Sequence, residues 1–145
     1  MNFCFWPDNP SGVFEYEHIT KNLESLLMKD PDFFTCERLS KVDEKFLNEH
    51  VFTTEKPFCL VNERARIVNE VAEVVKEKYE SKFENFIAKS GFDCPTLVKM
   101  IISEFSGFRD EAIFKGEQIF FYKRAQILCS DLIGAYSDID HPKQF

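Results

Sequence analysis

The chain has 145 residues, enough for one domain with a modest core. With 44% hydrophobic and 30% charged residues, its composition is typical of a globular protein and excludes a disordered chain. The formal net charge of −7 argues against sequence-independent binding of a long nucleic acid, because that affinity rests on Lys and Arg contacts to phosphates. A small nucleotide held by one or two local cations is compatible with this charge.

The start of the sequence and its hydropathy predict a location. Residues 1–3 lead directly into a strand-like segment, without the basic start and long apolar run of a signal peptide. No apolar stretch approaches the roughly 20 residues that a membrane-spanning helix needs. We therefore expect a soluble, cytoplasmic protein.

Five cysteines and three histidines are the residues to test for a metal site or a disulfide. The cysteines are widely spread, no Cys-x-x-Cys motif occurs, and the histidines do not cluster with them. Reduced, packed thiols are the expected outcome, Cys129 included. The sequence predicts no metal and no cofactor.

The first half of the chain predicts a short β element followed by helices. Alternating aromatic residues at 2–6 predict a strand, and residues 13–16, beyond a turn-rich segment, are its candidate hairpin partner. Apolar residues at three-to-four spacing predict a helix over 19–27, which the Asp-Pro pair at 30–31 ends. A capping signal at 40–43 opens a second helix.

The second half predicts three more helices. The longest pattern, over 60–88, has one apolar face and an opposite face of Glu and Lys that is typical of a solvated surface. Gly91 ends this helix, Pro95 lies at the start of the next, and Gly107 closes that one. An irregular stretch at 108–118 then leads to the last helix.

The last predicted helix, over 118–136, combines apolar residues nearly all round with several charges. An all-round apolar circumference predicts a buried helix. The helix nevertheless carries Lys123, Arg124 and Asp131, and the last two lie on one side, two turns apart. Buried charges are costly unless they are paired or used, so these residues mark a candidate site. The structural alternative is a fixed ion pair, or long side chains that reach solvent.

The same region carries a motif with defined spacing. It reads Phe-Arg-Asp at 108–110, a glycine after a short spacer, Phe-Tyr-Lys-Arg-Ala-Gln-Ile at 121–127, and Asp131. Two more stretches lie upstream, Asn-Phe-Cys-Phe-Trp at 2–6 and Leu-Val-Asn-Glu-Arg at 60–64. These three collinear stretches resemble the queuosine salvage proteins, the queuosine 5′-phosphate N-glycosylases. The resemblance spans most of the chain.

The resemblance implies a fold and a boundary. The family has a helical fold likened to that of DNA glycosylases, which agrees with the mainly α pattern and its small N-terminal β element. In the family, a helical region precedes the strand, and an Asp-Ile pair like that at 138–139 is followed by a Thr-x-Phe-Ala-Asp-Tyr-Arg motif. This sequence contains neither segment. We expect residues 1–145 to form a single helical domain that is the central part of a longer family domain.

The resemblance also implies a reaction, the hydrolysis of the N-glycosidic bond of queuosine 5′-monophosphate. The product queuine is a 7-deazaguanine base that is salvaged for transfer RNA modification. Cleavage builds oxocarbenium character on the ribose, so a carboxylate must face C1′, and the phosphate needs Lys, Arg or backbone N–H groups. In the family that carboxylate comes from the Phe-Ala-Asp motif. No catalytic residue is therefore assigned in this sequence.

The resemblance suggests roles for several residues. Lys123 and Arg124 are the candidate cations for the phosphate, or for orienting an acid. Asp131 is expected to position Arg124, and Asp110 is expected to brace the loop that leads to the helix. The structural alternative for each is a packed or paired residue of the core. Three aromatic residues of the N-terminal strand are candidates for stacking on the base or for the core: Phe3, Phe5 and Trp6.

Two other function classes stay open. One is a catalytically inactive, truncated relative that acts as a nucleotide- or protein-binding helical module. Such a chain would expose apolar surface that further helices cover in the family, and it would self-associate through that surface. The other is a helical scaffold without a ligand. If the chain is an enzyme, the expected partner is the small nucleotide queuosine 5′-monophosphate. Neither a long nucleic acid nor a membrane is expected as a partner.

Overall fold

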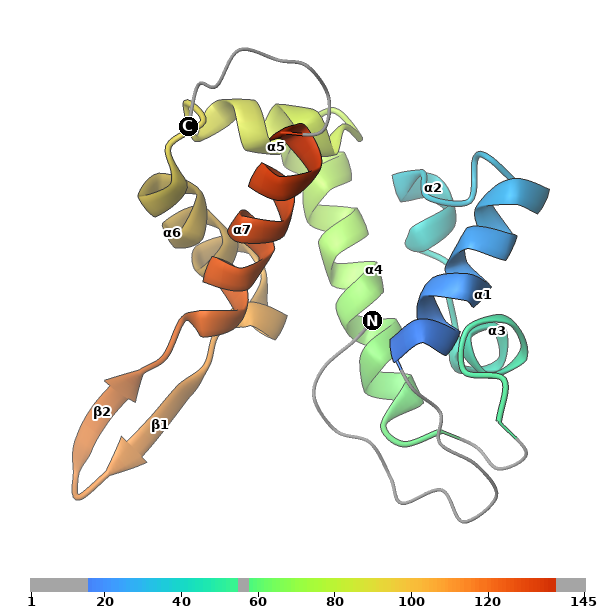
Figure 1. Cartoon of the computed structure of the whole chain (residues 1–145). Helices are drawn as coiled ribbons and strands as arrows, with labels where there is room; N and C mark the ends of the chain where they lie inside the picture. Colours follow the sequence, from blue (N-terminus) through green and yellow to red (C-terminus); the bar gives the residue numbers. More distant parts are fainter. Residues whose placement is uncertain (1–15, 55–57, 138–145) are drawn as a thin grey trace. The chain divides into compact units, whose positions relative to one another are not determined.

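The computed structural model describes residues 16–54 and 58–137 of the chain (Figure 1). The chain forms two compact units, Met1–Ser81 and Lys82–Phe145. The first unit contains four helices in its described residues: α1 (Tyr16–Lys29), α2 (Cys36–Leu39), α3 (Glu44–His50) and α4 (Val61–Lys78). The second contains α5 (Phe83–Lys89), α6 (Cys94–Glu104), a 3₁₀ turn η1 (Ser106–Phe108), β1 (Glu111–Phe114), β2 (Glu117–Phe120) and α7 (Lys123–Ser137). None of the helices described is long and apolar enough to cross a membrane.

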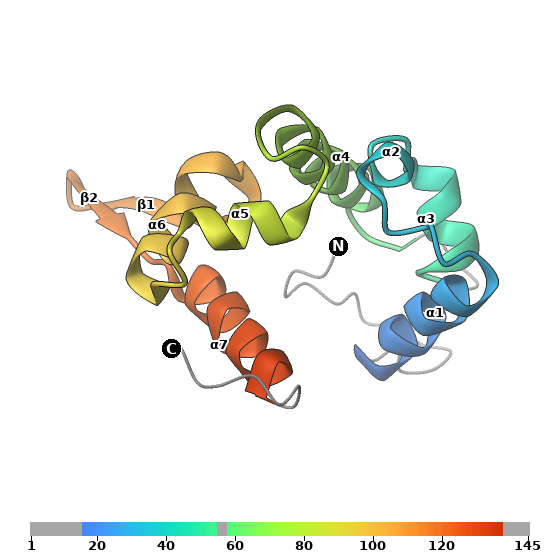
Figure 2. The ribbon, with the colours of Figure 1, turned by 90° about the horizontal axis from the view of Figure 1, so that it is seen from above.

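The helices of the first unit enclose one apolar core. In Figure 2, α2 and α3 lie beside α4, which they contact. Each helix contributes its apolar stripe because residues three and four apart lie on the same helix face. The buried members of this core are Ile19, Phe33, Val42, Leu47, Val51, Phe52, Phe58, Val61, Ala65 and Val68.

Polar contacts fix the connection between α2 and α3. The Asn69 side chain on α4 donates to the carbonyl oxygens of Leu39 (2.8 Å) and Val42 (3.0 Å). The Asp43 carboxylate accepts from the N–H of Phe46 (2.7 Å), as an N-cap does. The helix predicted from the capping signal at 40–43 is therefore confirmed as α3.

The pattern over 60–88 is not one helix but two, so that prediction is wrong. The chain leaves α4 at Tyr79, and Glu80 and Ser81 adopt left-handed φ values of 57° and 59°. The Ser81 hydroxyl donates to the Glu37 carboxylate (3.0 Å), which holds this bend against α2. The helix ends here without Gly or Pro, which is why the sequence pattern did not indicate a break.

The second unit is built on α6. Its N-cap is Asp93, whose carboxylate accepts from the Thr96 N–H (2.9 Å), and Pro95 lies in the first turn as predicted. Phe86 of α5 and Phe105 at the end of α6 pack with ring centroids 5.1 Å apart. The buried apolar residues of this unit are Phe86, Ile87, Leu97, Ile101, Phe105, Ala125 and Cys129.

The stretch predicted as irregular is an antiparallel hairpin, so that prediction is wrong. Strands β1 and β2 pair with Glu111 opposite Phe120 and Phe114 opposite Glu117. Lys115 and Gly116 form the turn with φ values of 51° and 83°. Positive φ at both central residues is what a two-residue type I′ turn requires.

The predicted N-terminal β element mostly lies outside the described residues, at 2–6 and 13–15. The exception is Tyr16, which begins helix α1 and is not part of a strand. The fold class is confirmed in its main part, because the described chain is mostly helical with a small antiparallel sheet. The likeness to DNA glycosylases stays a prediction.

Helix α7 begins at Lys123, five residues after the predicted start at 118, because β2 takes up the residues before it. The prediction of all-round burial is also wrong. Only Ala125 and Cys129 are buried among residues 123–135, and Ile127 is 48% exposed. The buried pair lies on one face, four residues apart, and α6 is the helix of this unit that packs against α7.

Candidate functional site

The Phe-Arg-Asp segment ties the end of α6 to the hairpin. The Arg109 guanidinium donates from Nε to the carbonyl oxygen of Ile102 (3.0 Å) and from a terminal nitrogen to that of Ser103 (3.1 Å). The last carbonyls of a helix lack partners within it, and a cation there also complements the helix dipole. Arg109 therefore has a structural role that fixes where the chain leaves α6.

Asp110 closes the base of the hairpin onto α7. Its carbonyl oxygen accepts from the Phe121 N–H (2.9 Å), which continues the ladder one pair beyond β1 and β2. Its carboxylate takes two hydrogen bonds from the Arg124 guanidinium, Nε to Oδ2 at 2.9 Å and Nη2 to Oδ1 at 2.5 Å. The Asp110 side chain is 29% exposed and the Arg124 side chain is 36% exposed. This two-bond geometry is the strong form of an Arg–carboxylate pair.

Asp110 is therefore a partner of Arg124 in the structure. Asp131, predicted to position Arg124, is exposed, and its side chain makes no hydrogen bond or ion pair with the residues that the structure describes. Helical spacing places both residues on one side of α7, but the carboxylate that contacts Arg124 comes from across the hairpin. The bracing role expected for Asp110 stays a prediction, and this contact is compatible with it.

Lys123 is the exposed cation of the motif. It is the first residue of α7, and within the described part of the chain its side chain has no hydrogen bond or ion pair. Its neighbour Arg124 is paired with Asp110, whose carboxylate offsets the Arg124 charge. The exposed Lys123 ammonium can hold a phosphate group by direct charge-assisted hydrogen bonding.

Aromatic residues precede this cation in the sequence. The rings of Phe120 and Tyr122 lie 6.0 Å apart, and Phe121 is 61% exposed. Exposed aromatic rings beside a cation can take up a planar base and its phosphate together. The aromatic run Phe-Phe-Tyr was the sequence signal for this arrangement, and our sequence reasoning did not use it. The predicted stacking residues lie outside the described residues: Phe3, Phe5 and Trp6.

The face of α7 opposite these groups is core. Burial raises the pKa of the Cys129 thiol, and nearby Cys94 raises it further. A raised thiol pKa disfavours the nucleophilic thiolate, so Cys129 is a packing residue, as predicted. No group of three or more His, Cys, Asp or Glu side chains within residues 16–54 and 58–137 is placed to hold a metal ion.

The Leu-Val-Asn-Glu-Arg stretch is the start of α4 in the first unit. Arg64 is only 1% exposed, and its guanidinium carbon lies 5.1 Å and 5.0 Å from the ring centroids of Phe52 and Phe58. Its Nε donates to the carbonyl oxygen of Cys59 (3.1 Å). Arg64 therefore anchors the entry to α4 by packing and hydrogen bonding.

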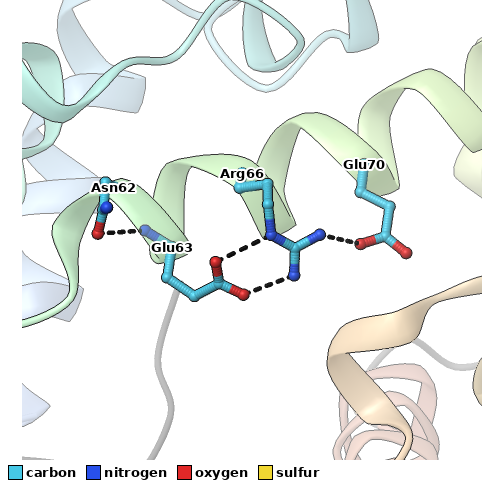
Figure 3. Close-up of polar contacts among 4 residues, drawn as sticks. All are labelled: Asn62, Glu63, Arg66 and Glu70. Carbon is cyan, nitrogen blue, oxygen red and sulfur yellow. Dashed lines mark hydrogen bonds and ion pairs between the residues drawn. The ribbon is translucent and has the colours of Figure 1, made fainter.

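Arg66, two residues on, faces outward and joins two carboxylates (Figure 3). It bonds Glu63 at 2.9 Å and 2.6 Å and Glu70 at 3.2 Å, while the Asn62 side chain accepts from the Glu63 N–H (2.8 Å). The hydrogen bond from Arg66 lowers the pKa of the Glu63 carboxyl, and the same contact raises the pKa of Arg66. These contacts are solvent-exposed charge pairs on the charged face of α4, and Arg66 and Glu63 were not part of the pattern from which that face was predicted.

Known proteins match this chain in sequence. The queuosine salvage protein family matches residues 1–144. A protein of Dictyostelium discoideum named queuosine 5′-phosphate N-glycosylase/hydrolase is 39% identical over 136 residues, which are 94% of this chain and 40% of that protein. A protein of Sphaerobacter thermophilus with the same name is 34% identical over 148 residues, 97% of this chain and 45% of its own length.

The match to a mammalian relative is shorter. The Mus musculus protein of that name is 45% identical over 78 residues, 54% of this chain and 23% of its own. The chain thus spans less than half the length of these relatives. A family match over nearly the whole sequence, together with relatives above 30% identity, agrees with the three motif stretches. This chain belongs to the queuosine salvage protein family.

Proposed function

We propose that this chain acts in the hydrolysis of queuosine 5′-phosphate to queuine and ribose 5-phosphate, and that Lys123 binds the phosphate of the substrate. The observation that carries the proposal is the exposed Lys123 ammonium beside the fixed Arg124–Asp110 pair, in the motif stretch of a family member. The names of its relatives support this substrate and reaction.

The proposed division of labour follows from the contacts. Lys123 is an exposed ammonium with three donors, suited to a phosphate group. Arg124 is held in two hydrogen bonds to Asp110, which offsets its charge, so its part is to fix the start of α7 beside Lys123. The exposed rings of Phe120 and Phe121 supply a surface for the base. The aromatic residues outside the described part, Phe3, Phe5 and Trp6, remain further stacking candidates.

The reaction itself needs water and a carboxylate near C1′ of the ribose. Hydrolysis transfers the ribosyl group from the base nitrogen to a water oxygen, and the departing base takes up a proton. No redox cofactor takes part in that balance. Asp110 is committed to Arg124, and Asp131 is exposed on α7, so neither is assigned to the ribose. We propose that residues 1–145 act as the central part of a longer family domain, in the cytoplasm.

The test is incubation of the chain with queuosine 5′-monophosphate, with queuine followed by chromatography and mass spectrometry. Release that is lost in Lys123→Ala and kept in Lys21→Ala supports the proposal. Lys21 is an exposed helical lysine in the first unit, so it controls for the loss of one charge. Calorimetric titration with the same nucleotide measures binding apart from turnover.

A second candidate is a catalytically inactive, nucleotide-binding helical module. The observation that favours it is that neither acidic residue of the motif stretch is free for the ribose in the described residues, because Asp110 holds Arg124 and Asp131 is exposed on α7. It predicts Lys123-dependent binding of the nucleotide without release of queuine. If a folded chain neither binds nor cleaves the nucleotide, both candidates are refuted and the helical scaffold remains.

A further inference from the structure

Arg109 joins the end of α6 to the base of the hairpin through its side chain. The C-cap residue of α6 is Phe105, whose N–H donates to the carbonyl oxygen of Ile101 (3.0 Å). The next two carbonyls, of Ile102 and Ser103, lie in the last turn, where a helix leaves its carbonyl groups without intrahelical partners. The Arg109 guanidinium donates to both of them, at 3.0 Å and 3.1 Å, so its side chain is tied to α6 at two points.

The residue after Arg109 passes this constraint on to α7. Asp110 accepts from the Phe121 N–H with its carbonyl oxygen (2.9 Å) and binds the Arg124 guanidinium with its carboxylate. Consecutive Cα atoms are about 3.8 Å apart across a planar peptide, so a fixed Arg109 backbone leaves Asp110 little freedom. Lys123 lies between Phe121 and Arg124 in the chain, so its backbone is tied on both sides to the end of α6.

Packing contributes little at this end of α7. The buried residues of α7 among 123–135 are Ala125 and Cys129, which are small side chains. Small side chains form shallow ridges, so they resist a shift of one helix along another only weakly. In the first turn, Lys123 is exposed and Arg124 is only partly buried. The polar contacts of the Arg-Asp pair at 109–110 therefore hold the start of α7 in place.

We propose that Arg109 is a positioning residue for the phosphate-binding cation: by bonding α6, it sets where the Lys123 ammonium meets the 5′-phosphate of the nucleotide. This inference rests on the proposed function, in which Lys123 binds that phosphate. Arg109 is assigned no contact with the nucleotide, because its guanidinium is turned to the carbonyls of Ile102 and Ser103. Its loss acts through Lys123 and affects only the part of the affinity that depends on the phosphate.

The test is a binding cycle on the full chain. Dissociation constants for queuosine 5′-monophosphate and for queuosine are measured by calorimetric titration, directly or in competition. Their ratio, the phosphate preference, isolates the contact with the phosphate. We expect Lys123→Ala to lower this preference about tenfold or more, and Arg109→Ala to lower it about threefold to tenfold. In the double variant the preference should fall no further than in Lys123→Ala, because the group that Arg109 positions is then absent.

Two further variants separate positioning from a general loss of charge or of folding. Arg38→Ala removes a 57% exposed arginine that pairs with Asp30 in the first unit, and it should leave the phosphate preference unchanged. Arg109→Lys keeps the charge but has one nitrogen in place of the planar fork, so it should restore only part of the preference. If circular dichroism shows that Arg109→Ala does not fold, Arg109→Lys takes its place in the cycle.

The outcomes distinguish the role of Arg109 from that of Lys123. A phosphate preference that is unchanged in Arg109→Ala overturns the inference. An additive loss in the double variant also overturns it, because Arg109 would then bind the phosphate directly. In both cases Lys123 keeps its proposed role. If Lys123→Ala keeps the full preference, the proposed role of Lys123 is refuted and the inference falls with it.

Discussion

The Asp110–Arg124 pair is predicted to hold the base of the hairpin against α7, and a double-mutant cycle tests this directly. The variants are Asp110→Asn, Arg124→Gln and the double variant. Asn keeps the shape of Asp110, but its amide nitrogen would face the guanidinium and cannot accept a hydrogen bond. The pair should therefore show a coupling free energy that neither single change reports alone.

The magnitude follows from the contact geometry. Hydrogen bonds to a charged group contribute about 1.5–3 kcal/mol net when they are shielded from solvent. With side chains 36% and 29% exposed, solvent screening lowers this value. We expect a coupling of about 1–2 kcal/mol. The control cycle is on Lys45 and Glu49, 4.0 Å apart with side chains 78% and 54% exposed, where about 0.3 kcal/mol is expected.

The assay is urea unfolding of all the variants, with helicity followed by circular dichroism. Raised salt should reduce the control coupling more than that of Asp110 and Arg124, because exposed pairs are screened more strongly. Arg124→Lys should lose most of the coupling with Asp110 although it keeps the charge, since Lys lacks the planar fork that matches a carboxylate. If the Asp110–Arg124 coupling is no larger than the control value, this contact does not hold the hairpin and our reasoning is refuted.

Three more outcomes are expected. Gly116→Ala should destabilise the hairpin by about 1 kcal/mol because of its φ of 83°, with no atom within 4 Å of the added Cβ; hydrogen exchange of the strand amides measures this. Glu80→Gly should stabilise the chain by about 0.5 kcal/mol in urea unfolding by relieving a φ of 57°, and Ser81→Gly should gain less, since it also loses a hydrogen bond. The hydrogen bonds from Thr96 lower the pKa of the Asp93 carboxyl in the folded chain. The ionised carboxylate therefore stabilises the fold fully above the unfolded pKa of about 4, and this contribution is lost as pH falls through the lower folded pKa. The difference in Tm between the native chain and Asp93→Ala should shrink over that range.

Features fixed by local chemistry could be predicted from the sequence. Pro95 indicated the start of α6, whose N-cap the structure places at Asp93, and the signal ending at Asp43 indicated the start of α3. In both cases a carboxylate accepts a hydrogen bond from an N–H three residues on, so the information lies within one turn. The buried face of α4 could also be predicted from the sequence, because its apolar residues recur with the helical period.

The hairpin could not be read in the same way. Strand prediction relies on alternation between a buried and a solvated face, and neither face of β1 or β2 is buried. The turn is Lys115-Gly116 instead of the stronger Asn-Gly or Asp-Gly signal. Phe120 and Phe121 then looked like part of an apolar helix, which moved the predicted start of α7 upstream.

The partner of Arg124 was missed for the same reason. Helical spacing offered Asp131, and it was correct that the two residues lie on one side of α7. Asp110 lies fourteen residues before Arg124 and reaches it only because the hairpin brings the two ends together. A contact that depends on a hairpin cannot be found where the hairpin itself is not predicted.

The hairpin also explains the spacing of the motif and isolates one of its residues. Two four-residue strands and a two-residue turn return the chain so that Phe121 pairs with Asp110 and Arg124 reaches the same carboxylate. Removing one residue from either strand would reverse the faces beyond it and break this closure. Asp110, Gly116 and Arg124 thus each have a structural reason to stand where they do. Lys123 is the charged residue at the hairpin base whose described contacts supply no such structural reason. Replacing Lys123 by Ala should therefore weaken nucleotide binding and leave the free energy of unfolding unchanged.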